Sequence, residues 1–446
     1  MRLYVTIAEE TPEEAVAAIR RLPADHDGVE VRVERFRSYE PAAFRAATEK
    51  PLIVTRRGAA QNRDEVRRAI EAGLDLVDVE YGGDLGWIEP FRDRIVLSHH
   101  DFEGMPDAGP LLEKMRACRC LHTKLAVTPR SLADNLRLLE HLRPGTTLIG
   151  MGERGLFSRI LAPFLGSELA FVSPAADRGA APGQIPLDRA LAIYGPARRA
   201  LRAERVFAVA GNPASHSLSP AIHNPLFRSK GVPAAYTIAS VESFDELVAP
   251  FTAGTLSGLS ITAPFKEEAY AFAVRVGAAV GENARDSGAV NTLVNAGGAI
   301  LADNTDVDAF SQVVARVCGR DRKSVALIGA GGTARAAMVA LGRAGMHVTV
   351  YNRTEERGRV LAARGGARFE PLEALSRFDG EIVVNTATAA AAIAVPLRPG
   401  MTCIEAAYGG GRRERPAGVE WIDGIELLHA QAVRQNELFM KVFDGS

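Results

Sequence analysis

The chain has 446 residues, which is enough for about two to four domains at ~100–200 residues each. Apolar residues make up 47% and charged residues 24%, the balance of a globular protein rather than of a disordered one. Lysine and arginine total 53 and aspartate and glutamate 54, so the formal net charge is −1, and we expect no nucleic-acid partner and no membrane-surface partner.

The N-terminus and the cysteines indicate a cytoplasmic protein. The segment Met1–Ile7 runs directly into a strand-like pattern without an apolar signal sequence, and no apolar run reaches the ~20 residues of a membrane span. The four cysteines, Cys118, Cys120, Cys318 and Cys403, lack the spacing of a zinc site. We expect reduced thiols, no metal and a cytoplasmic location.

Residues 1–195 alternate short apolar strands with amphipathic helical stretches. Apolar residues recur at helical spacing in Pro12–Arg21 and Arg63–Ala72, for example. Eight segments have the composition of strands: Leu3–Ile7, Val29–Val33, Leu52–Thr55, Leu76–Glu80, Ile95–His100, Leu121–Ala126, Thr147–Gly152 and Leu169–Ser173. Eight alternating β and α units predict a compact (β/α)8 barrel at residues 1–195.

Charged and polar side chains stand at the ends of these predicted strands. They are Glu30, Arg32, Arg57, Glu80, His100, Lys124 and, just past the seventh strand, Arg159. A barrel interior is normally packed with Val, Ile and Leu, so charged groups there need partners or a function. One such charge is explained by a structural ion pair, but this many predict an active site at the mouth of the barrel.

Lys124 and His100 suggest the chemistry of that site. His100 ends the fifth predicted strand and Lys124 lies on the sixth, so both side chains can face one cavity. A strand lysine among apolar residues loses proton affinity through desolvation, and a neutral amine can attack a ketone to form an imine. A nearby imidazole can then move a proton from the adjacent carbon to a leaving hydroxyl. The alternative for a lone strand lysine is a side chain that extends to solvent.

The pattern changes after residue 195. Residues 196–205 form a short basic linker, and Val206–Gly211 begins an α/β domain that we place at residues 206–306. The strand Ser324–Ile328, a helix to about Arg343 and the strand His347–Tyr351 form a βαβ unit, typical of a Rossmann-like domain, which we place at residues 307–420. Residues 421–446 are predicted to be C-terminal helices that close onto the domain at 206–306.

A glycine-rich turn opens the helix of this βαβ unit. The turn contains Gly329, Gly331, Gly332, Thr333 and Ala334, so the backbone can approach a pyrophosphate at the helix N-terminus. The next strand ends in Asn352, Arg353 and Thr354, with Arg357 one turn further on and no acid at its tip. An acid there binds the ribose hydroxyl of NAD, whereas arginines suit the additional phosphate of NADP. We predict NADP(H) as the cofactor; the alternative is that both arginines are solvated and bind no phosphate.

A second set of polar residues lies between the linker and this turn. It comprises Ser217, Ser219, Thr262, Lys266, Asn291 and Asp306. Together they supply hydroxyl, amide, ammonium and carboxylate groups, a set suited to a small polyhydroxylated acid. Ser217 and Ser219 by themselves indicate little, because either hydroxyl can simply cap a helix.

The N-terminal half resembles type I 3-dehydroquinate dehydratases over nearly its full length. The motifs that carry the resemblance are Glu30-Val-Arg32, Ser98-His-His-Asp-Phe102, Lys124, Met151–Arg159 and Ala181-Pro-Gly-Gln184. The resemblance implies that Lys124 forms a Schiff base with the substrate ketone and that His100 is the acid–base group, whereas His99 is not at the catalytic position. It also implies that the substrate is held by Glu30, Arg32, Arg57, Arg159 and Gln184.

Two positions depart from the pattern of that family. Gln61 stands where a carboxylate is expected near the histidine, and loss of that negative charge should lower the tendency of the histidine to hold a proton. Ala180 replaces a serine before Ala-Pro-Gly-Gln, which removes one hydrogen bond from the lid to the substrate. We expect dehydratase activity to persist because Lys124 and His100 are intact; a decayed site is the alternative.

From Val206 to the C-terminus the chain resembles shikimate dehydrogenases. The resemblance implies that Lys266 and Asp306 are the catalytic pair, because a lysine beside an aspartate can protonate and stabilise the alkoxide that hydride transfer leaves. It implies that the substrate is bound by Ser217, Ser219, Thr262, Asn291 and Gln431, with Tyr408 and Gln431 returning from the cofactor domain to close the site. Departures from the family at Ser260, Ala309, Glu405 and within Asn385–Ala391 bear on rates and cofactor discrimination rather than on the reaction type.

The two resemblances match consecutive reactions, the dehydration of 3-dehydroquinate and the reduction of 3-dehydroshikimate to shikimate with NADPH. They predict a bifunctional shikimate-pathway enzyme whose partners are these three small molecules, with the oligomeric state left open. One alternative is a dehydratase fused to a quinate dehydrogenase, which the second hydroxyl of the serine pair, at Ser219, disfavours. Another is a non-catalytic sugar-acid sensor, which has no need to keep Lys124, His100, Lys266 and Asp306.

Overall fold

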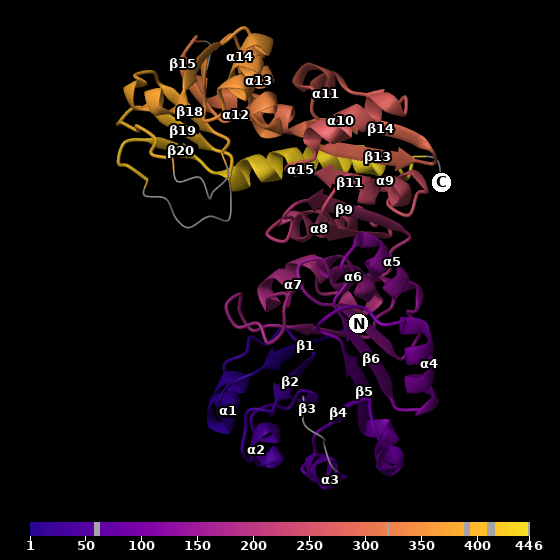
Figure 1. Cartoon of the computed structure of the whole chain (residues 1–446). Coiled ribbons are helices and arrows are strands. Elements are labelled where there is room, and N and C mark those ends of the chain that lie inside the picture. The colour runs from indigo at the N-terminus through magenta and orange to yellow at the C-terminus, as the bar shows by residue number, and fades with distance from the viewer. Residues whose placement is uncertain (58–62, 319–320, 388–392, 408–414, 445–446) are drawn as a thin grey trace. The chain divides into compact units, whose positions relative to one another are not determined.

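The computed structural model describes residues 1–57, 63–318, 321–387, 393–407 and 415–444 (Figure 1). The chain forms two compact units. The first comprises Met1–Val206 and Ser217–Val241, and the second comprises Phe207–His216 and Glu242–Ser446. The five-part division that the sequence suggests, with boundaries after residues 195, 205, 306 and 420, stays a prediction. No helix within the described ranges has the length and apolar character needed to cross a membrane.

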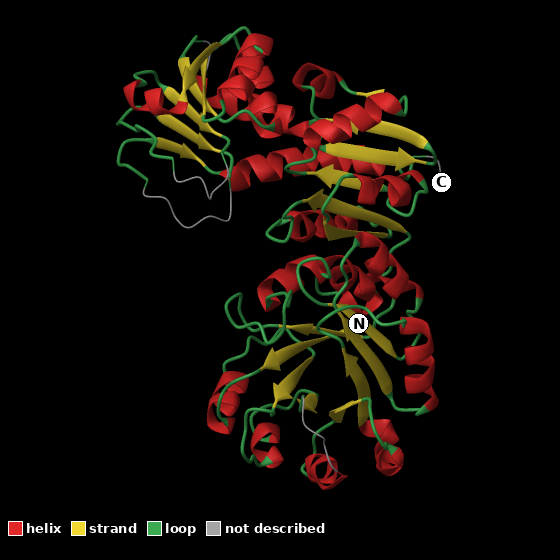
Figure 2. Cartoon of the chain, viewed as in Figure 1, coloured by secondary structure: helices red, strands yellow, loops and turns green. Residues whose placement is uncertain are grey.

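The first unit is built on a barrel of eight parallel strands (Figure 2). The strands are β1 (Arg2–Ile7), β2 (Gly28–Arg32), β3 (Leu52–Thr55), β4 (Leu76–Glu80), β5 (Ile95–His100), β6 (His122–Val127), β7 (Thr146–Gly150) and β8 (Leu169–Val172). Their order is β7-β6-β5-β4-β3-β2-β1-β8, so β7 and β8 stand at its two ends and the barrel is nearly closed. Each predicted strand is confirmed to within about two residues, and so is the predicted (β/α)8 class.

Helices connect the strands of the barrel and follow its last strand. They are α1 (Pro12–Arg20), α2 (Pro41–Arg45), α3 (Arg63–Glu71), α4 (Ala108–Ala117), α5 (Leu132–Glu140), α6 (Leu156–Leu161) and α7 (Leu187–Tyr194), with the 3-10 helices η1 (Gly86–Arg94), η2 (Ala162–Leu165) and η3 (Arg198–Ala200). α1 and α5 begin with capping boxes, formed by Thr11 with Glu14 and by Ser131 with Asp134. Each box satisfies two backbone N–H groups that a helix start leaves without partners.

The interior of the barrel changes from apolar to polar along its axis. Its apolar layer includes Tyr4, Leu76, Val96, Leu169 and Phe171. Alternation along the strands then places polar side chains on the same inner face, nearer the carboxyl ends. These buried side chains are Thr6, Glu30, Thr55, Asp78, Ser98 and Lys124. The polar end of the interior is therefore the end where barrel enzymes hold their active sites.

The first unit also contains α8 (Ser219–Ser229) and β10 (Ala234–Ser240), which follow the barrel in the chain. Thr237 Oγ1 donates a hydrogen bond of 2.9 Å to the carbonyl of Phe157 in α6. Arg228 Nη2 donates one of 3.0 Å to the carbonyl of Ala192, near the end of α7. The last carbonyls of a helix lack partners within it, so Arg228 satisfies α7 where that helix ends.

The second unit contains a mixed sheet and a parallel sheet. The mixed sheet has the order β9-β11-β13-β14-β12 within this unit. Its strands are β9 (Arg205–Gly211), β11 (Gly258–Ile261), β12 (Ala279–Val280), β13 (Thr292–Ala296) and β14 (Ala299–Asp303), accompanied by α9 (Asp245–Thr252), α10 (Lys266–Arg275) and α11 (Glu282–Ser287). β13 and β14 form a hairpin, and the positive φ of Gly297 and Gly298, +64° and +99°, explains the glycine pair at its turn.

The parallel sheet has the order β17-β16-β15-β18-β19-β20. In chain order this is 3-2-1-4-5-6, the topology of dinucleotide-binding domains, with the switch point between β15 and β18. Its elements are β15 (Ser324–Ile328), β16 (His347–Asn352), β17 (Arg368–Pro371), β18 (Ile382–Asn385), β19 (Thr402–Glu405) and β20 (Glu420–Ile422), with α12 (Thr305–Cys318), α13 (Gly332–Arg343), α14 (Glu355–Arg364) and the 3-10 helix η4 (Leu372–Arg377). The predicted Rossmann-like unit is confirmed.

The long helix α15 (Gly424–Met440) carries the chain back from the parallel sheet. It packs against α12 and against β13 of the mixed sheet, and Figure 1 shows it, in yellow, running alongside these elements. At its far end the ring of Phe439 lies 4.8 Å from that of Phe207 on β9. α15 thereby brings residues from the end of the chain to the mixed sheet.

Candidate active sites

A small cavity lies at the polar end of the barrel interior. Six of the residues predicted to form the site line it: Glu30, Arg32, Arg57, Lys124, Arg159 and Gln184. Thr6, Met151, Phe171, Ala180 and Ala181 contribute to the same lining. His100 is not part of this lining, but it lies on β5 beside Lys124 on β6, since Ser98 and Lys124 pair in register. The structure therefore gathers the predicted groups into one site.

Lys124 is the most deeply buried cation of this site, with 1% of its surface exposed. Its Nζ lies 2.7 Å from Asp78 Oδ2 and 3.5 Å from Glu30 Oε1, and 4.3 Å from the centre of the Phe171 ring. The sequence argument placed this lysine among apolar residues, and that part is wrong. Its neighbours in sequence point to the opposite face of the strand, and other strands supply two carboxylates instead.

Glu30 is ionised despite complete burial. Burial opposes its charge, but the cations of Lys124, Arg32 and Arg57 outweigh that cost and hold its pKa at about 2. Thr6 Oγ1 and Thr55 Oγ1 donate hydrogen bonds of 2.7 and 2.9 Å to its two oxygens. Glu30 is thus a fixed acceptor on the floor of the cavity.

Glu80 holds His100 through two contacts. His100 Nδ1 is 2.6 Å from Glu80 Oε2, and the backbone N–H of His100 donates a hydrogen bond of 2.8 Å to Glu80 Oε1. The pKa of His100 is lowered, first by burial, while the hydrogen bond with Glu80 raises it and the charges of Lys124 and Arg57 lower it. The predicted reason for a lowered pKa was a missing carboxylate at Gln61, which lies outside the described residues. Burial is the larger cause here, and a carboxylate is present.

The rim of the cavity carries arginine and amide groups. Arg159 Nε donates a hydrogen bond of 2.9 Å to the carbonyl of Gly150, and burial lowers the pKa of Arg159 to about 10. Gln184 Nε2 donates to Thr6 Oγ1 at 2.9 Å, and the backbone N–H of Ala180 donates to Gln184 Oε1 at 2.8 Å. Ala180 thus contributes its backbone to the lid where its side chain has no hydroxyl to offer.

Sequence reasoning named Glu80 only as a charge at a strand end and missed Asp78, Ser98, Thr6 and Thr55. The signal was available in part. Asp78 and Glu80 are two apart in Leu76–Glu80, so both face the same side of one buried strand. Ser98 Oγ donates to Asp78 Oδ1 at 2.5 Å, which ties β5 to β4 beside Lys124.

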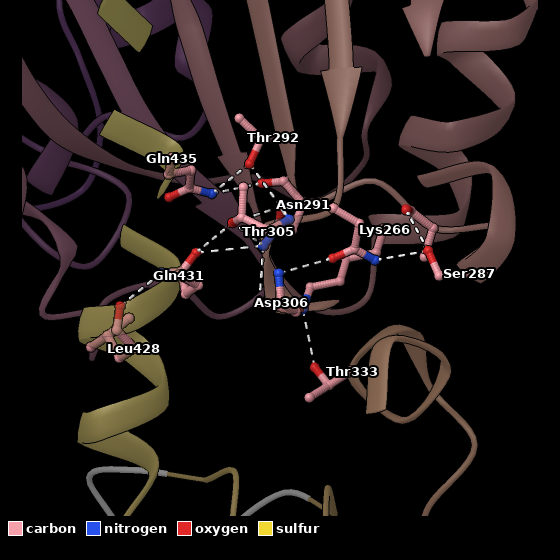
Figure 3. A network of polar contacts seen from close by, with 12 residues as sticks. Lys266, Ser287, Asn291, Thr292, Thr305, Asp306, Thr333, Leu428, Gln431 and Gln435 are labelled. Carbon is pink, nitrogen blue, oxygen red and sulfur yellow. Dashed lines mark hydrogen bonds and ion pairs between the residues drawn. The ribbon is translucent and has the colours of Figure 1, made fainter. Parts of the chain in front are cut away.

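A second site surrounds Lys266 in the second unit (Figure 3). Lys266 Nζ lies 2.5 Å from Asp306 Oδ2 and donates a hydrogen bond of 3.0 Å to Thr333 Oγ1. Lys266 begins α10, Asp306 lies in the first turn of α12, and Thr333 lies in the first turn of α13. The predicted catalytic pair is therefore assembled at the start of three helices, where backbone N–H groups favour negative charge.

Asn291 is the centre of a buried polar network beside this pair (Figure 3). Its Nδ2 donates to Asp306 Oδ1 at 2.9 Å and to Thr305 Oγ1 at 3.0 Å. Gln431 Oε1, from α15, accepts hydrogen bonds from Asn291 Nδ2 at 3.4 Å and from Thr305 Oγ1 at 3.3 Å. The network brings three predicted residues, Asn291, Asp306 and Gln431, together, and it adds Thr305, which the sequence analysis missed.

Gln435, one turn beyond Gln431 on α15, also holds the network in place. Its Nε2 donates to the carbonyl of Asn291 at 3.0 Å and to Thr292 Oγ1 at 2.9 Å, and its Oε1 accepts from Ser260 Oγ at 2.7 Å. Ser260, noted as a departure from the family, thus bonds to the closing helix. Neither Gln435 nor Thr292 was predicted.

The remaining predicted substrate residues are placed as follows. Thr262 follows β11, and its backbone N–H donates to the carbonyl of Ala210 at 2.9 Å. Ser217 and Ser219 belong to the first unit, where Ser217 Oγ donates to Ser219 Oγ at 3.0 Å. Their role beside the Lys266 site stays a prediction. Tyr408 lies outside the described residues.

The glycine-rich turn fits an anionic cofactor. Gly331 caps α13 without a side-chain hydrogen bond, and a Cβ added to it would meet nothing within 4 Å, so there is open space beside the start of this helix, where unpaired backbone N–H groups favour anions. Gly329 has a φ of +107°, which requires glycine. A Cβ on Gly332 would lie 2.8 Å from Lys266 Cδ, so only glycine lets the turn approach this lysine.

The tip of β16 carries the predicted phosphate-binding residues. Asn352 Nδ2 donates to the carbonyl of Thr354 at 2.7 Å, which fixes the turn, and Arg353 is exposed. Arg357 Nη2 lies 3.6 Å from Glu267 Oε1, and Arg335 Nη2 lies 2.8 Å from Glu267 Oε2. The surface beside the tip thus offers cations to an anion, which fits the phosphate of NADP.

Three sequence families match the chain in succession. The family described as "Type I 3-dehydroquinase" matches residues 3–198. "Shikimate dehydrogenase substrate binding domain" matches residues 209–293, and "Shikimate / quinate 5-dehydrogenase" matches residues 313–399. The first range contains the barrel strands, the second covers most of the mixed sheet, and the third covers β15 to β18 of the parallel sheet.

Some curated relatives match about half of the chain, and others match about three quarters of it. "Shikimate dehydrogenase (NADP(+))" of Syntrophobacter fumaroxidans is 34% identical over 53% of this chain and 87% of its own length. "Bifunctional 3-dehydroquinate dehydratase/shikimate dehydrogenase, chloroplastic" of Arabidopsis thaliana is 29% identical over 73% of this chain, which spans 58% of that protein. "Shikimate biosynthesis protein AroDE" of Chlamydia muridarum is 28% identical over 78% of this chain and 73% of its own length.

A (β/α)8 barrel with a buried lysine at its mouth is thus followed in the chain by a dinucleotide-binding sheet, whose glycine-rich turn lies beside a Lys–Asp pair. The chain belongs to the shikimate dehydrogenase family, and a type I 3-dehydroquinase domain precedes its dehydrogenase part.

Proposed function

We propose that the chain catalyses the dehydration of 3-dehydroquinate to 3-dehydroshikimate and the NADPH-dependent reduction of 3-dehydroshikimate to shikimate. The observation that carries the proposal is the pairing of two complete constellations in one chain: Lys124 with His100 in the barrel, and Lys266 with Asp306 beside the glycine-rich turn. The product of the first site is the substrate of the second. The cytoplasm is the proposed location, supported by free thiols at Cys118 and Cys120.

In the dehydratase site, the carboxylate, the imidazole and the arginines have different proposed roles. Asp78, 2.7 Å from Lys124 Nζ, is placed to receive the proton that the lysine must lose before it attacks the ketone. The ketone oxygen leaves as water when the imine forms on Lys124. His100 then takes a proton from the carbon next to the imine, and the electron pair left there expels the hydroxyl on the following carbon, which leaves as water with the proton from His100. Hydrolysis of the imine releases the product and restores the lysine. Arg32, Arg57 and Arg159 hold the substrate carboxylate and hydroxyls.

In the dehydrogenase site, NADPH supplies the hydride when it is bound. Lys266 Nζ, held by Asp306, donates a proton to the substrate oxygen as negative charge develops there. Asn291 holds Asp306 through its other oxygen at 2.9 Å, so the carboxylate keeps its orientation toward the lysine. Ser217, Ser219, Thr262, Asn291, Tyr408 and Gln431 are the proposed substrate ligands, and Ser219 favours shikimate over quinate.

A coupled assay tests the proposal. Purified protein with 3-dehydroquinate and NADPH is expected to form the enone absorbance first and to oxidise NADPH after a lag. Enone without NADPH oxidation would favour a quinate dehydrogenase in the second half. Absence of both signals, with added 3-dehydroshikimate also left unreduced, would favour the sensor.

The dehydratase should remain active in weakly acidic solution. Its base must be neutral, and the pKa of His100 lies below 6.5, because burial, Lys124 and Arg57 outweigh the opposing effects of Glu80 and Asp78. The protonated, inactive form therefore accumulates only below that pH, and kcat is expected to fall on the acid side with a midpoint under 6.5. The profile of kcat is the one to measure, since Lys124 is already in the imine. A midpoint above 6.5 would contradict the assignment.

Replacement of Arg353 and Arg357 by alanine should weaken the binding of NADPH. Loss of charge-assisted contacts of about 1.5–3 kcal/mol predicts a KM for NADPH raised roughly 10- to 100-fold, while the KM for NADH changes little. Arg359→Ala is the matched control, because Arg359 lies on the same helix but pairs with Glu355. Equal changes in the KM for NADPH and for NADH would show that these arginines do not recognise the additional phosphate of NADPH.

A further inference from the structure

Two nitrogen atoms of His100, the ring Nδ1 and the backbone N, contact the same carboxylate on β4, that of Glu80. Glu80 Oε2 is 2.6 Å from the ring atom Nδ1, and Glu80 Oε1 accepts the backbone N–H of His100 at 2.8 Å. This double contact needs the parallel register of β4 and β5, in which Glu80 pairs with Ser98. The pKa of Glu80 is lowered, because its hydrogen bonds and charge interactions with His100 outweigh burial. Glu80 is therefore a charged acceptor at neutral pH.

A carboxylate that only accepts hydrogen bonds determines which ring nitrogen carries the proton. With Glu80 ionised, Nδ1 must be the N–H, and Nε2 is left with its lone pair. Nε2 is buried and has no hydrogen-bond partner among the described residues. The imidazole ring lies nearly parallel to the ring of Phe102, with 6.3 Å between centres and 15° between planes. The guanidinium of Arg57, from the cavity lining, lies 5.6 Å from the centre of the Phe102 ring. Nε2 is thus the one ring atom free to act on a substrate.

No other carboxylate in the described part of the site is placed for this task. Asp78 is already engaged by Lys124 Nζ at 2.7 Å and by Ser98 Oγ at 2.5 Å. Glu30 is engaged by two threonine hydroxyls and by Lys124. His99 Nδ1 lies 3.9 Å from Glu80 Oε1, outside hydrogen-bond distance, so it does not compete for the carboxylate.

We propose that Glu80 is a positioning residue of the dehydratase, which fixes the Nδ1-protonated tautomer of His100 so that Nε2 acts as the base. The proposal rests on the proposed dehydration at this site. In this role Glu80 acts through His100; its further hydrogen bond is a longer one of 3.4 Å, which Glu80 Oε2 accepts from Ser98 Oγ.

Glu80→Gln tests this role with almost no change in shape. The backbone N–H of His100 is always a donor, so the amide oxygen of glutamine must take that contact and the amide NH2 must face Nδ1. The ring then has to accept at Nδ1 and carry its proton on Nε2, which removes the base. Because general base catalysis contributes about 10²- to 10⁴-fold, we expect kcat for dehydration to fall by that factor.

Imine trapping separates this role from a merely structural one. With borohydride and 3-dehydroquinate, the Glu80→Gln variant should still be reduced onto Lys124, as shown by peptide mass, because the lysine and its own carboxylates are unchanged. Its reduction of 3-dehydroshikimate should match the unaltered chain. Glu80→Asp, which keeps the charge, should recover part of the lost kcat, and His99→Asn should leave kcat within about threefold, since its ring makes no hydrogen bond to Glu80.

The outcomes are distinguishable. If the unaltered chain neither traps an imine nor dehydrates 3-dehydroquinate, the proposed function itself fails. If the unaltered chain does both and Glu80→Gln keeps near-normal kcat, the positioning role is overturned. Loss of imine trapping in Glu80→Gln would overturn it as well, because Glu80 would then act on Lys124 or on substrate binding.

Discussion

Lys124→Ala is expected to abolish dehydration and leave the reduction of 3-dehydroshikimate unchanged. No other amine lines the described cavity, so the variant has no group there to form an imine with the substrate. Removal of the covalent route is expected to lower kcat by roughly four orders of magnitude or more. The measurement is enone formation from 3-dehydroquinate, with NADPH oxidation on added 3-dehydroshikimate followed in the same preparation.

The structure also predicts a stability effect, which the controls must separate from catalysis. Alanine leaves Asp78 and Glu30 buried without the ammonium group that balances them, and breaking a buried pair costs about 3–5 kcal/mol. Lys124→Arg keeps the positive charge but offers no amine for an imine, so it should stay folded and inactive. Lys114→Ala, on the exposed side of α4, should retain both activities. Normal dehydration by Lys124→Arg would show that the imine mechanism is wrong.

Lys266→Met should have the reciprocal effect, a loss of reduction with dehydration intact. Methionine fills the space of the lysine stem against Gly332 but cannot donate a proton to the substrate oxygen, so kcat is expected to fall about 10²- to 10⁴-fold. NADPH oxidation with 3-dehydroshikimate is the measurement, and a binding titration with NADP+ checks that the turn is intact. Asp306→Asn should give a loss of the same order, because Asp306 holds Lys266 at 2.5 Å.

The exposed Lys230 provides the matched control for Lys266. Lys230→Ala should leave both activities unchanged, since its side chain is exposed and the cap at the end of α8 is made by its backbone N–H. Reduction at a normal rate by Lys266→Met would contradict the assignment of the proton donor and would leave the Lys266–Asp306 contact as a structural ion pair.

The barrel was predictable because its pattern is local. Each strand is a short apolar run between segments whose apolar residues recur at helical spacing, so the strands could be located to within about two residues. The positions of Glu30, Arg57 and Lys124 at strand ends were enough to predict a common site, since the carboxyl ends of parallel strands meet at one mouth.

The partners within the site were not predictable, because they depend on register. Lys124 was expected among apolar residues, yet Thr123 and Leu125 point away from the interior and Asp78 reaches it from two strands away. In the same way, Gln435 meets Thr292 across more than a hundred residues of sequence. A motif identifies a catalytic side chain, whereas the groups that orient it come from whichever strand or helix the fold places beside it.

The make-up of the first compact unit has a consequence for how the gene can be divided. This unit omits residues 207–216 but includes α8 and β10, and Arg228 and Thr237 bond to backbone carbonyls of α7 and α6. A fragment that stops at the linker after residue 195 would keep every barrel strand and still lose these donors, leaving two helix surfaces uncovered. Truncation there is therefore expected to yield an aggregation-prone fragment, because α6 and α7 lose the elements that cover them.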